Sequence, residues 1–180
     1  RMDNYDILIG SATGSYPHVT YTDLTNNYTF SGQTVVVNGD LVVSNTLVLG
    51  DSNSSGTLIV TGDLELRGST ASELQVNHIE LLIGGNVFDF NQMSLTGEPA
   101  TIYADQIAFK NLGIIDLTGG ELFATDIELR KLSTFTNCMV YSTEFITQYG
   151  IDVDNTTIIT KIFDSFGTIS FHESMLWIMK

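Results

Sequence analysis

Acidic side chains recur at one position of a repeated motif, just before the second of two short apolar runs. The motif reads TVVVNGDLVV at residues 34–43 and TLIVTGDLEL at residues 57–66, which puts Asp40 and Asp63 at equivalent positions. Looser copies downstream extend this acidic column, whose members in order are Asp40, Asp63, His78, Gln106, Asp126, Glu144 and Lys161. If the copies stack as strands, neighbouring members lie about 5 Å apart on one ridge.

Two kinds of chemistry suit such a column. Stacked carboxylates attract a divalent cation such as Ca²⁺, and an acidic ridge also suits an enzyme that acts on polysaccharides. The alternative is a solvated outward corner, where Asp serves as a turn residue. His78, Gln106 and Lys161 interrupt the series of acids. Since no Arg or Lys neighbours Asp40 or Asp63 either, we favour the corner.

The candidate calcium ligands are Asp63 and Asp126 of this column, and Asp152 and Asp154 of the segment DVDN. DVDN lacks the Gly and the distal Glu of an EF-hand loop, so turn chemistry also accounts for it. The three histidines do not have the spacing of a zinc site. There is no GxSxG elbow, P-loop or GxGxxG segment. We therefore expect that the chain is not an enzyme and has neither catalytic residues nor a cofactor. The alternative is that it binds Ca²⁺.

The charge of the chain limits its partners. The net charge is −14, with 7 Lys and Arg residues against 21 Asp and Glu residues. Phosphate backbones and anionic membranes repel a chain this acidic, so we expect no nucleic-acid partner. No apolar run approaches the length of a membrane span. The single cysteine, Cys138, lies in an alternating segment and cannot form an internal disulfide, so we expect it to be buried in the core.

The elements that position these residues are short strands separated by tight corners. In the copy at 34–43, two apolar runs flank the corner Asn38-Gly39-Asp40, and their alternation indicates that one face of each strand is buried. The first apolar residue of each copy falls at 35, 58, 74, 102, 122, 140 and 158. A repeat of roughly 20 residues is typical of a solenoid, because a unit this short cannot bury its apolar face alone.

We therefore predict an all-β fold, a single-stack parallel β-helix (solenoid) of about seven irregular coils. A β-sandwich and a trimeric β-prism remain the alternatives, since their strands alternate too. Segment 83–100 falls in the longest gap between copies and is predicted to be a protruding loop or an extra strand. The predicted core is one file of inward side chains: Leu41, Leu64, Ile79, Ile107, Ile127, Phe145 and Phe163.

The extent of the repeat divides the chain into three segments. Residues 34–168 hold the solenoid repeats. Residues 1–33 lack the repeat and are expected to cap the solenoid or to connect it to another domain, because an open end exposes unpaired strand edges. Residues 169–180 are expected to cap the last coil or to contact another subunit.

Aromatic residues concentrate late in the chain. We expect them to stack in the core, with an outward strip for a sugar or a subunit as the alternative. They are Phe109, Phe123, Phe135, Tyr141, Phe145, Phe163, Phe166, Phe171 and Trp177.

The segment 35–69, which contains VVVNGDLVVSNTLVLG and LIVTGDLELRGS, resembles the shafts and necks of bacteriophage tail fibres and tail spikes. In those proteins, strings of the VNGDL type build trimeric β-prisms or β-helices. The same pattern is similar to the bactofilins, cytoskeletal proteins whose β-helix coils polymerise end to end. Bactofilins keep a more uniform period than residues 82–180 show.

The expected function is that of a non-enzymatic structural or adhesive protein of a virion (a tail-fibre or tail-spike component) or of a cell surface. The chain is expected to form a homo-oligomer, with a trimer as the predicted state, and to meet other structural subunits or a surface glycan. Two alternatives are a bactofilin-like cytoplasmic filament and a polysaccharide-acting β-helix enzyme that uses the acidic column.

Overall fold

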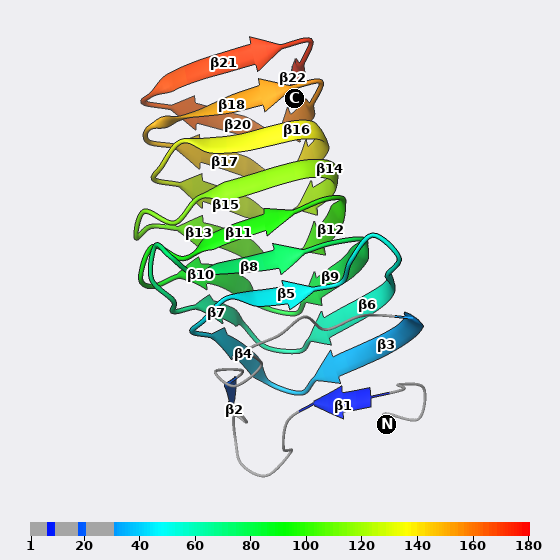
Figure 1. Cartoon of the computed structure of the whole chain (residues 1–180). Helices are drawn as coiled ribbons and strands as arrows, with labels where there is room; N and C mark the ends of the chain where they lie inside the picture. Colours follow the sequence, from blue (N-terminus) through cyan, green and yellow to red (C-terminus); the bar gives the residue numbers. More distant parts are fainter. Residues whose placement is uncertain (1–6, 10–17, 21–30) are drawn as a thin grey trace.

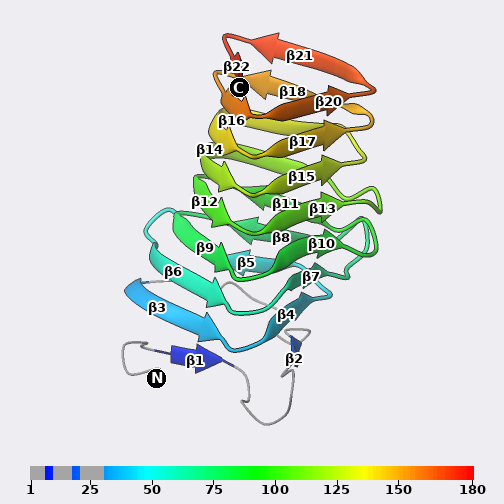
Figure 2. The ribbon, with the colours of Figure 1, turned by 180° about the vertical axis from the view of Figure 1, so that it is seen from behind.

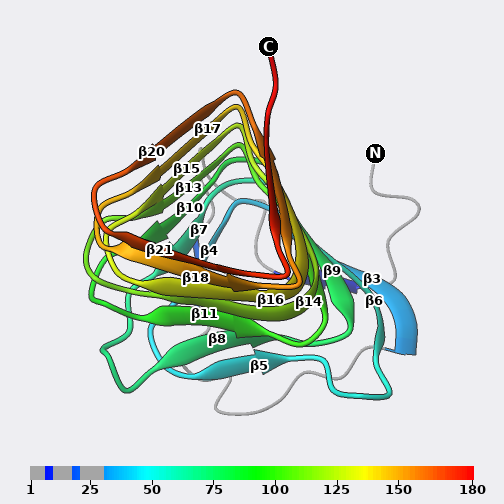
Figure 3. The same cartoon turned by 90° about the horizontal axis from the view of Figure 1, so that it is seen from above.

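The computed structural model describes residues 7–9, 18–20 and 31–180. Within these residues the chain is all-β, without helices, and its strands coil into a parallel β-solenoid of about seven turns (Figures 1 and 2). Seen along the axis, the later coils stack on a triangular outline with one strand on each side (Figure 3). The predicted parallel β-helix is confirmed.

Each side of the triangle is a face to which every full coil contributes one strand. The first face holds β3 (Ser31–Val37), β6 (Ser55–Val60), β9 (Ile79–Ile83), β12 (Ala100–Tyr103), the second halves of β14 (Ile115–Phe123) and β16 (Ser133–Tyr141), β19 (Thr157–Thr160) and β22 (Met175–Ile178). The second face holds β4 (Asp40–Val43), β7 (Leu64–Leu66), β10 (Asn86–Asp89), β13 (Gln106–Phe109), β15 (Asp126–Leu129), β17 (Glu144–Thr147) and β20 (Ile162–Ser165). The third face holds β5 (Leu47–Leu49), β8 (Glu73–Val76), β11 (Ser94–Gly97), the first halves of β14 and β16, β18 (Gly150–Asp154) and β21 (Thr168–His172).

The coils shorten along the chain. Matching residues of neighbouring coils are 23 residues apart at Asp40 and Asp63, but 18 residues apart at Ser142 and Thr160. Much of the difference lies at the corner between the third and first faces, where the connection shrinks from residues 50–54 to residues 155–156. At the corner between the second and third faces, the connections range from residues 67–72 to residues 148–149.

The sequence alignment was wrong at one coil. Leu58 lies opposite Leu81, whereas Leu74 lies in the third face opposite Leu47. Of the two predictions for segment 83–100, the protruding loop is wrong and the strand is confirmed, because the segment contains β10 and β11 of a regular coil. The error arises because strands of all three faces alternate alike, so the pattern does not tell which face a strand belongs to.

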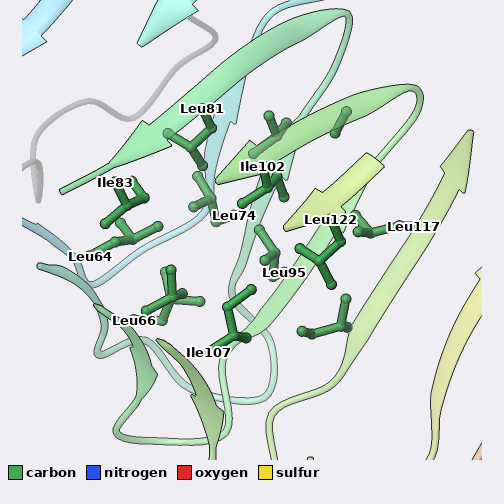
Figure 4. Close-up of a cluster of buried hydrophobic side chains, with 14 of the residues drawn as sticks. Leu64, Leu66, Leu74, Leu81, Ile83, Leu95, Ile102, Ile107, Leu117 and Leu122 are labelled. Carbon is green, nitrogen blue, oxygen red and sulfur yellow. The ribbon is translucent and has the colours of Figure 1, made fainter. Parts of the chain in front are cut away.

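The interior is filled by files of apolar side chains that run along the axis. Ile79 does not belong to the file in which it was predicted, because it lies on the first face opposite Ala100. Figure 4 shows labelled leucine and isoleucine side chains from all three faces converging on this interior. The strand register places these residues in the predicted file: Leu41, Leu64, Val87, Ile107, Ile127, Phe145 and Phe163.

Strands continue the solenoid toward both ends of the described chain. β1 (Ile7–Ile9) pairs with β3, and β2 (His18–Thr20) pairs with β4. Most of the segment predicted to be a cap or connector, residues 1–33, lies outside the described residues. β21 and β22 continue the coil, and among the described strands β20, β21 and β22 each pair on one side only.

Candidate functional site

Asp40 and Asp63 tie neighbouring coils together. Asp40 Oδ1 accepts a hydrogen bond from the Asp63 N–H at 2.9 Å, and Asp63 Oδ1 accepts one from the Asn86 N–H at 2.7 Å. Asn86 and Ile162 occupy the column positions that the sequence alignment gave to His78 and Lys161. Since each of these two carboxylates binds the backbone of the next coil, this pair stabilises the stacking of coils.

The predicted calcium ligands do not come together. Asn86 and Gln106 separate Asp63 from Asp126 along the column. Asp152 and Asp154 lie on a different face, in β18. In the part of the chain that the structure describes, no three His, Cys, Asp or Glu side chains are grouped to hold a metal ion.

A buried carboxylate that the sequence analysis did not single out lies at the end of β10. Asp89 is only 2% exposed. Its carboxylate accepts hydrogen bonds from the Asn111 N–H at 2.9 Å and from the Gly113 N–H at 2.7 Å. These bonds satisfy the buried charge and hold the loop after β13 against the previous coil.

Replacing Asp89 by Ala is expected to lower the free energy of unfolding by about 2–4 kcal/mol, because the buried Gly113 N–H and the part-buried Asn111 N–H lose a charged acceptor. Urea denaturation followed by circular dichroism measures this loss. The matched control is Asp126→Ala, which removes the same charge from a half-exposed side chain and is expected to change stability by less than about 0.5 kcal/mol. Equal losses in the two variants would contradict the structural role of Asp89.

Cys138 is buried, as the alternating pattern predicted. Its thiol donates to the carbonyl oxygens of Thr136 at 3.2 Å and Leu117 at 3.3 Å. Burial raises the pKa of this thiol to about 11, so the sulfur is protonated at neutral pH. A neutral buried thiol is a poor nucleophile, and Cys138 therefore serves packing.

The late aromatic residues divide between the core and the outer surface. Phe135 and Phe145 are buried as predicted, whereas Phe123 and Tyr141 face outward from the first face together with Tyr103. The core prediction is wrong for this outward pair, because aromatic side chains suit either side of a strand. It is also wrong for three exposed residues near the end of the described chain, Phe166, Phe171 and Trp177.

The outward rings stack on one another along the axis. Ring centroids are 4.5 Å apart from Tyr103 to Phe123 and from Phe123 to Tyr141, with the ring planes 1° and 3° from parallel. We call these three side chains the aromatic ladder. The register continues their row on one side to Leu82 and Ile59, and on the other side to Ile159 and Trp177. The outer side of the first face thus carries a long apolar row.

The last coil, which we define as β20 to β22 with the residues that connect and follow them, exposes large apolar side chains. Phe166 is 78% exposed and Trp177 is 59% exposed. The coil is the uppermost one in Figure 1, where β21 is drawn in orange-red. The full set of its exposed large apolar residues is Ile162, Phe166, Phe171, Met175, Trp177, Ile178 and Met179.

A surface groove lies at the corner between the second and third faces. It is lined by the loops that follow four successive strands of the second face, at residues 90–92, 110–112, 130 and 148–149. We call it the corner groove. Four of the seven Lys and Arg residues of the chain follow second-face strands at this corner, namely Arg67, Lys110, Arg130 and Lys131.

The sequence analysis missed the corner groove because its copies were aligned wrongly at one coil. With the correct register, the residue immediately after each strand of the second face is basic, aromatic or an amide in five successive coils. These residues are Arg67, Phe90, Lys110, Arg130 and Gln148. That row becomes visible only when β10 is recognised as a strand of the second face.

Comparisons of this chain with protein-family models, with curated proteins and with solved structures find no match in any of the three. Among the described residues there is no helix whose length and apolar character suit a membrane span.

Proposed function

We propose that the chain is a non-enzymatic structural or adhesive rod of a virion, as a component of a tail fibre or tail spike, or of a cell surface. It associates with further copies of itself through the solenoid. The resemblance of residues 35–69 to tail-fibre shafts supports this assignment. The parallel coil supplies the stiff rod that such a role needs.

The observation that carries the proposal is the apolar last coil. Several of its large apolar side chains, including the rings of Phe166 and Trp177, are exposed to water. Contiguous apolar patches of this kind are uncommon on monomeric proteins and mark sites of association.

The apolar row of the first face supports side-by-side packing of rods, as in a trimer. It is uncharged from Ile59 to Trp177, which suits the approach of copies that each carry a net charge of −14. The alternative function, a bactofilin-like filament, is favoured by the last coil instead, because its exposed apolar side chains suit head-to-tail stacking.

Deleting residues 169–180 is expected to change the oligomeric state or the solubility, because the deletion removes β22 and most of β21. Sedimentation velocity over a range of protein concentrations measures the change. A milder variant, Met175→Ser with Trp177→Ser, keeps the backbone of the coil and should weaken association in the same direction. Tyr149→Ser is the control, since this ring is 64% exposed but lies outside the last coil.

Negative-stain microscopy of the unaltered chain separates the two functions. Discrete short assemblies support the fibre component, and long filaments support the cytoplasmic scaffold. A chain that sediments as a monomer at every concentration, or a deletion variant with an unchanged profile, would contradict self-association through the last coil.

A further inference from the structure

The corner groove combines three kinds of side chain. It contains the cations Lys110 and Arg130, the aromatic rings of Phe90 and Tyr149, and the amides of Gln92 and Gln148. The groove spans four successive coils, so its length follows the solenoid axis.

The residues that line the groove include two cations and no carboxylate, in a strongly negative chain. Lys110 Nζ lies 2.6 Å from Glu128 Oε2, and Arg130 Nε lies 3.8 Å from Glu128 Oε1. Two cations thus share one carboxylate, while the Asp89 carboxylate behind the groove wall is bound by the Asn111 and Gly113 N–H groups. Arg130 Nε is also a buried donor that makes no hydrogen bond within the described residues. The pair is therefore suited to a further anion.

The Tyr149 ring of the groove differs from the rings of the aromatic ladder, and also from Phe90, which lies under the Arg67 guanidinium. In the ladder each ring face lies against its neighbour, so Phe123 has both faces covered. Tyr149 is 64% exposed and contacts no other aromatic ring among the described residues. A free, flat apolar face of this kind is what the C–H groups of a sugar ring stack against.

The amides supply hydrogen-bonding groups for hydroxyls. The side chains of Gln92 and Gln148 make no hydrogen bond within the described residues. The groove wall between them is held in place, because Asn111 Nδ2 donates to the Asp89 carbonyl at 2.6 Å and the Asn111 N–H donates to the Asp89 carboxylate. These bonds fix the loop after β13 to the end of β10, the strand that leads into the loop of Gln92.

We infer that the corner groove binds an anionic saccharide, a sugar that carries a carboxylate or a sulfate. Lys110 and Arg130 bind the anion, Tyr149 stacks on the sugar ring, and the two glutamine amides bind its hydroxyls. An acidic peptide would use the cations but has no hydroxyl-bearing ring for Tyr149 and the amides. This inference rests on the adhesive part of the proposed function, whose self-association it does not require.

The test is isothermal titration calorimetry of the full chain with four probes. They are a hyaluronan hexasaccharide, a sulfated dextran oligosaccharide, uncharged maltohexaose and a glutamate hexapeptide. We expect binding of at least one of the two anionic saccharides, weakening as salt rises from about 0.05 to 0.3 M because the contact is charged and exposed. The first two probes distinguish a carboxylate from a sulfate as the recognised group.

Variants assign the binding to the groove. Lys110→Ala with Arg130→Ala, and separately Tyr149→Ala, should weaken binding at least tenfold. The matched controls are Lys161→Ala, which removes a cation from another corner, and Tyr103→Ala, which removes a ring of the aromatic ladder. Both controls should bind as the unaltered chain does.

The inference is overturned by any of four results. These are no binding of either anionic saccharide, equal binding of maltohexaose, equal binding of the glutamate peptide, or full binding by the groove variants. Sedimentation of the same samples keeps the two proposals apart. If the chain self-associates but binds neither anionic saccharide, saccharide binding by the groove is contradicted and the structural rod is supported. If the chain is a monomer that binds one of them, saccharide binding is supported and self-association is contradicted.

Discussion

Leu64→Asp and Ile127→Asp are each expected to unfold the chain at room temperature. Both side chains point into the central file and are no more than 1% exposed. A carboxylate there loses its water without gaining a partner, which costs several kcal/mol and adds to the lost burial of about 1.5–3 kcal/mol. The sum approaches the whole stability of a typical domain, about 5–15 kcal/mol. Far-ultraviolet circular dichroism with a thermal scan measures the loss.

The matched control for these two variants is Val48→Asp. Val48 alternates with Leu47 and Leu49 in β5 and faces outward, so the same substituent meets water there. We expect its thermal transition to be kept, with a shift of a few degrees at most. If either core variant unfolds at the temperature of the unaltered chain, the assignment of the central file is wrong.

Gly120→Ala is expected to destabilise the chain by at least about 3 kcal/mol, from backbone strain and overpacking together. Gly120 lies where β14 turns from the third face to the first, with φ of 103°. A Cβ atom there would lie 2.0 Å from the carbonyl oxygen of Ala100 in the neighbouring coil. That oxygen is fixed in β12 and cannot swing aside as a side-chain atom can.

Gly119→Asn is the control, because it tests positive φ without the collision. Gly119 has φ of 70°, and the nearest atom to an added Cβ is the Pro99 side chain at 3.3 Å. Asn137 and Asn155 occupy the equivalent corner in later coils with φ of 54° and 45°. We expect the control to stay within about 1 kcal/mol of the unaltered chain in urea denaturation. Equal losses in the two variants would contradict the tight contact between coils.

The solenoid was predictable because each strand buries one side. Alternation at Leu41 and Leu64, around corners that contain Gly and Asp, repeats along the chain and requires stacking. The face to which a strand belongs was not predictable at every coil, since Leu74 and Leu81 lie in equally alternating runs. Only the register of the stacked coils separates them.

The surface was less predictable than the core. Asp40 and Asp63 were recognised as corner residues, but their hydrogen bonds to the next coil depend on the exact stacking. Phe123 and Tyr141 point outward because successive residues of a strand point to opposite sides. One residue more or less at the preceding corner would turn both side chains inward. The corner groove joins side chains about 20 residues apart in sequence, as Phe90 and Lys110 are, so it becomes visible only when the register of the coils is known.

The central claim is that successive coils lie flush along one axis. Pulsed electron paramagnetic resonance tests it with a spin label at Thr157→Cys and a second label at Glu80→Cys, Thr57→Cys or Thr34→Cys. The Cys138→Ser background removes the native thiol, and dilution with unlabelled chain removes signals between copies. These four positions share one outward row of the first face. The stacked coils predict distances that rise in equal steps, about 19, 24 and 29 Å, and distances that do not rise with the number of intervening coils would contradict the solenoid.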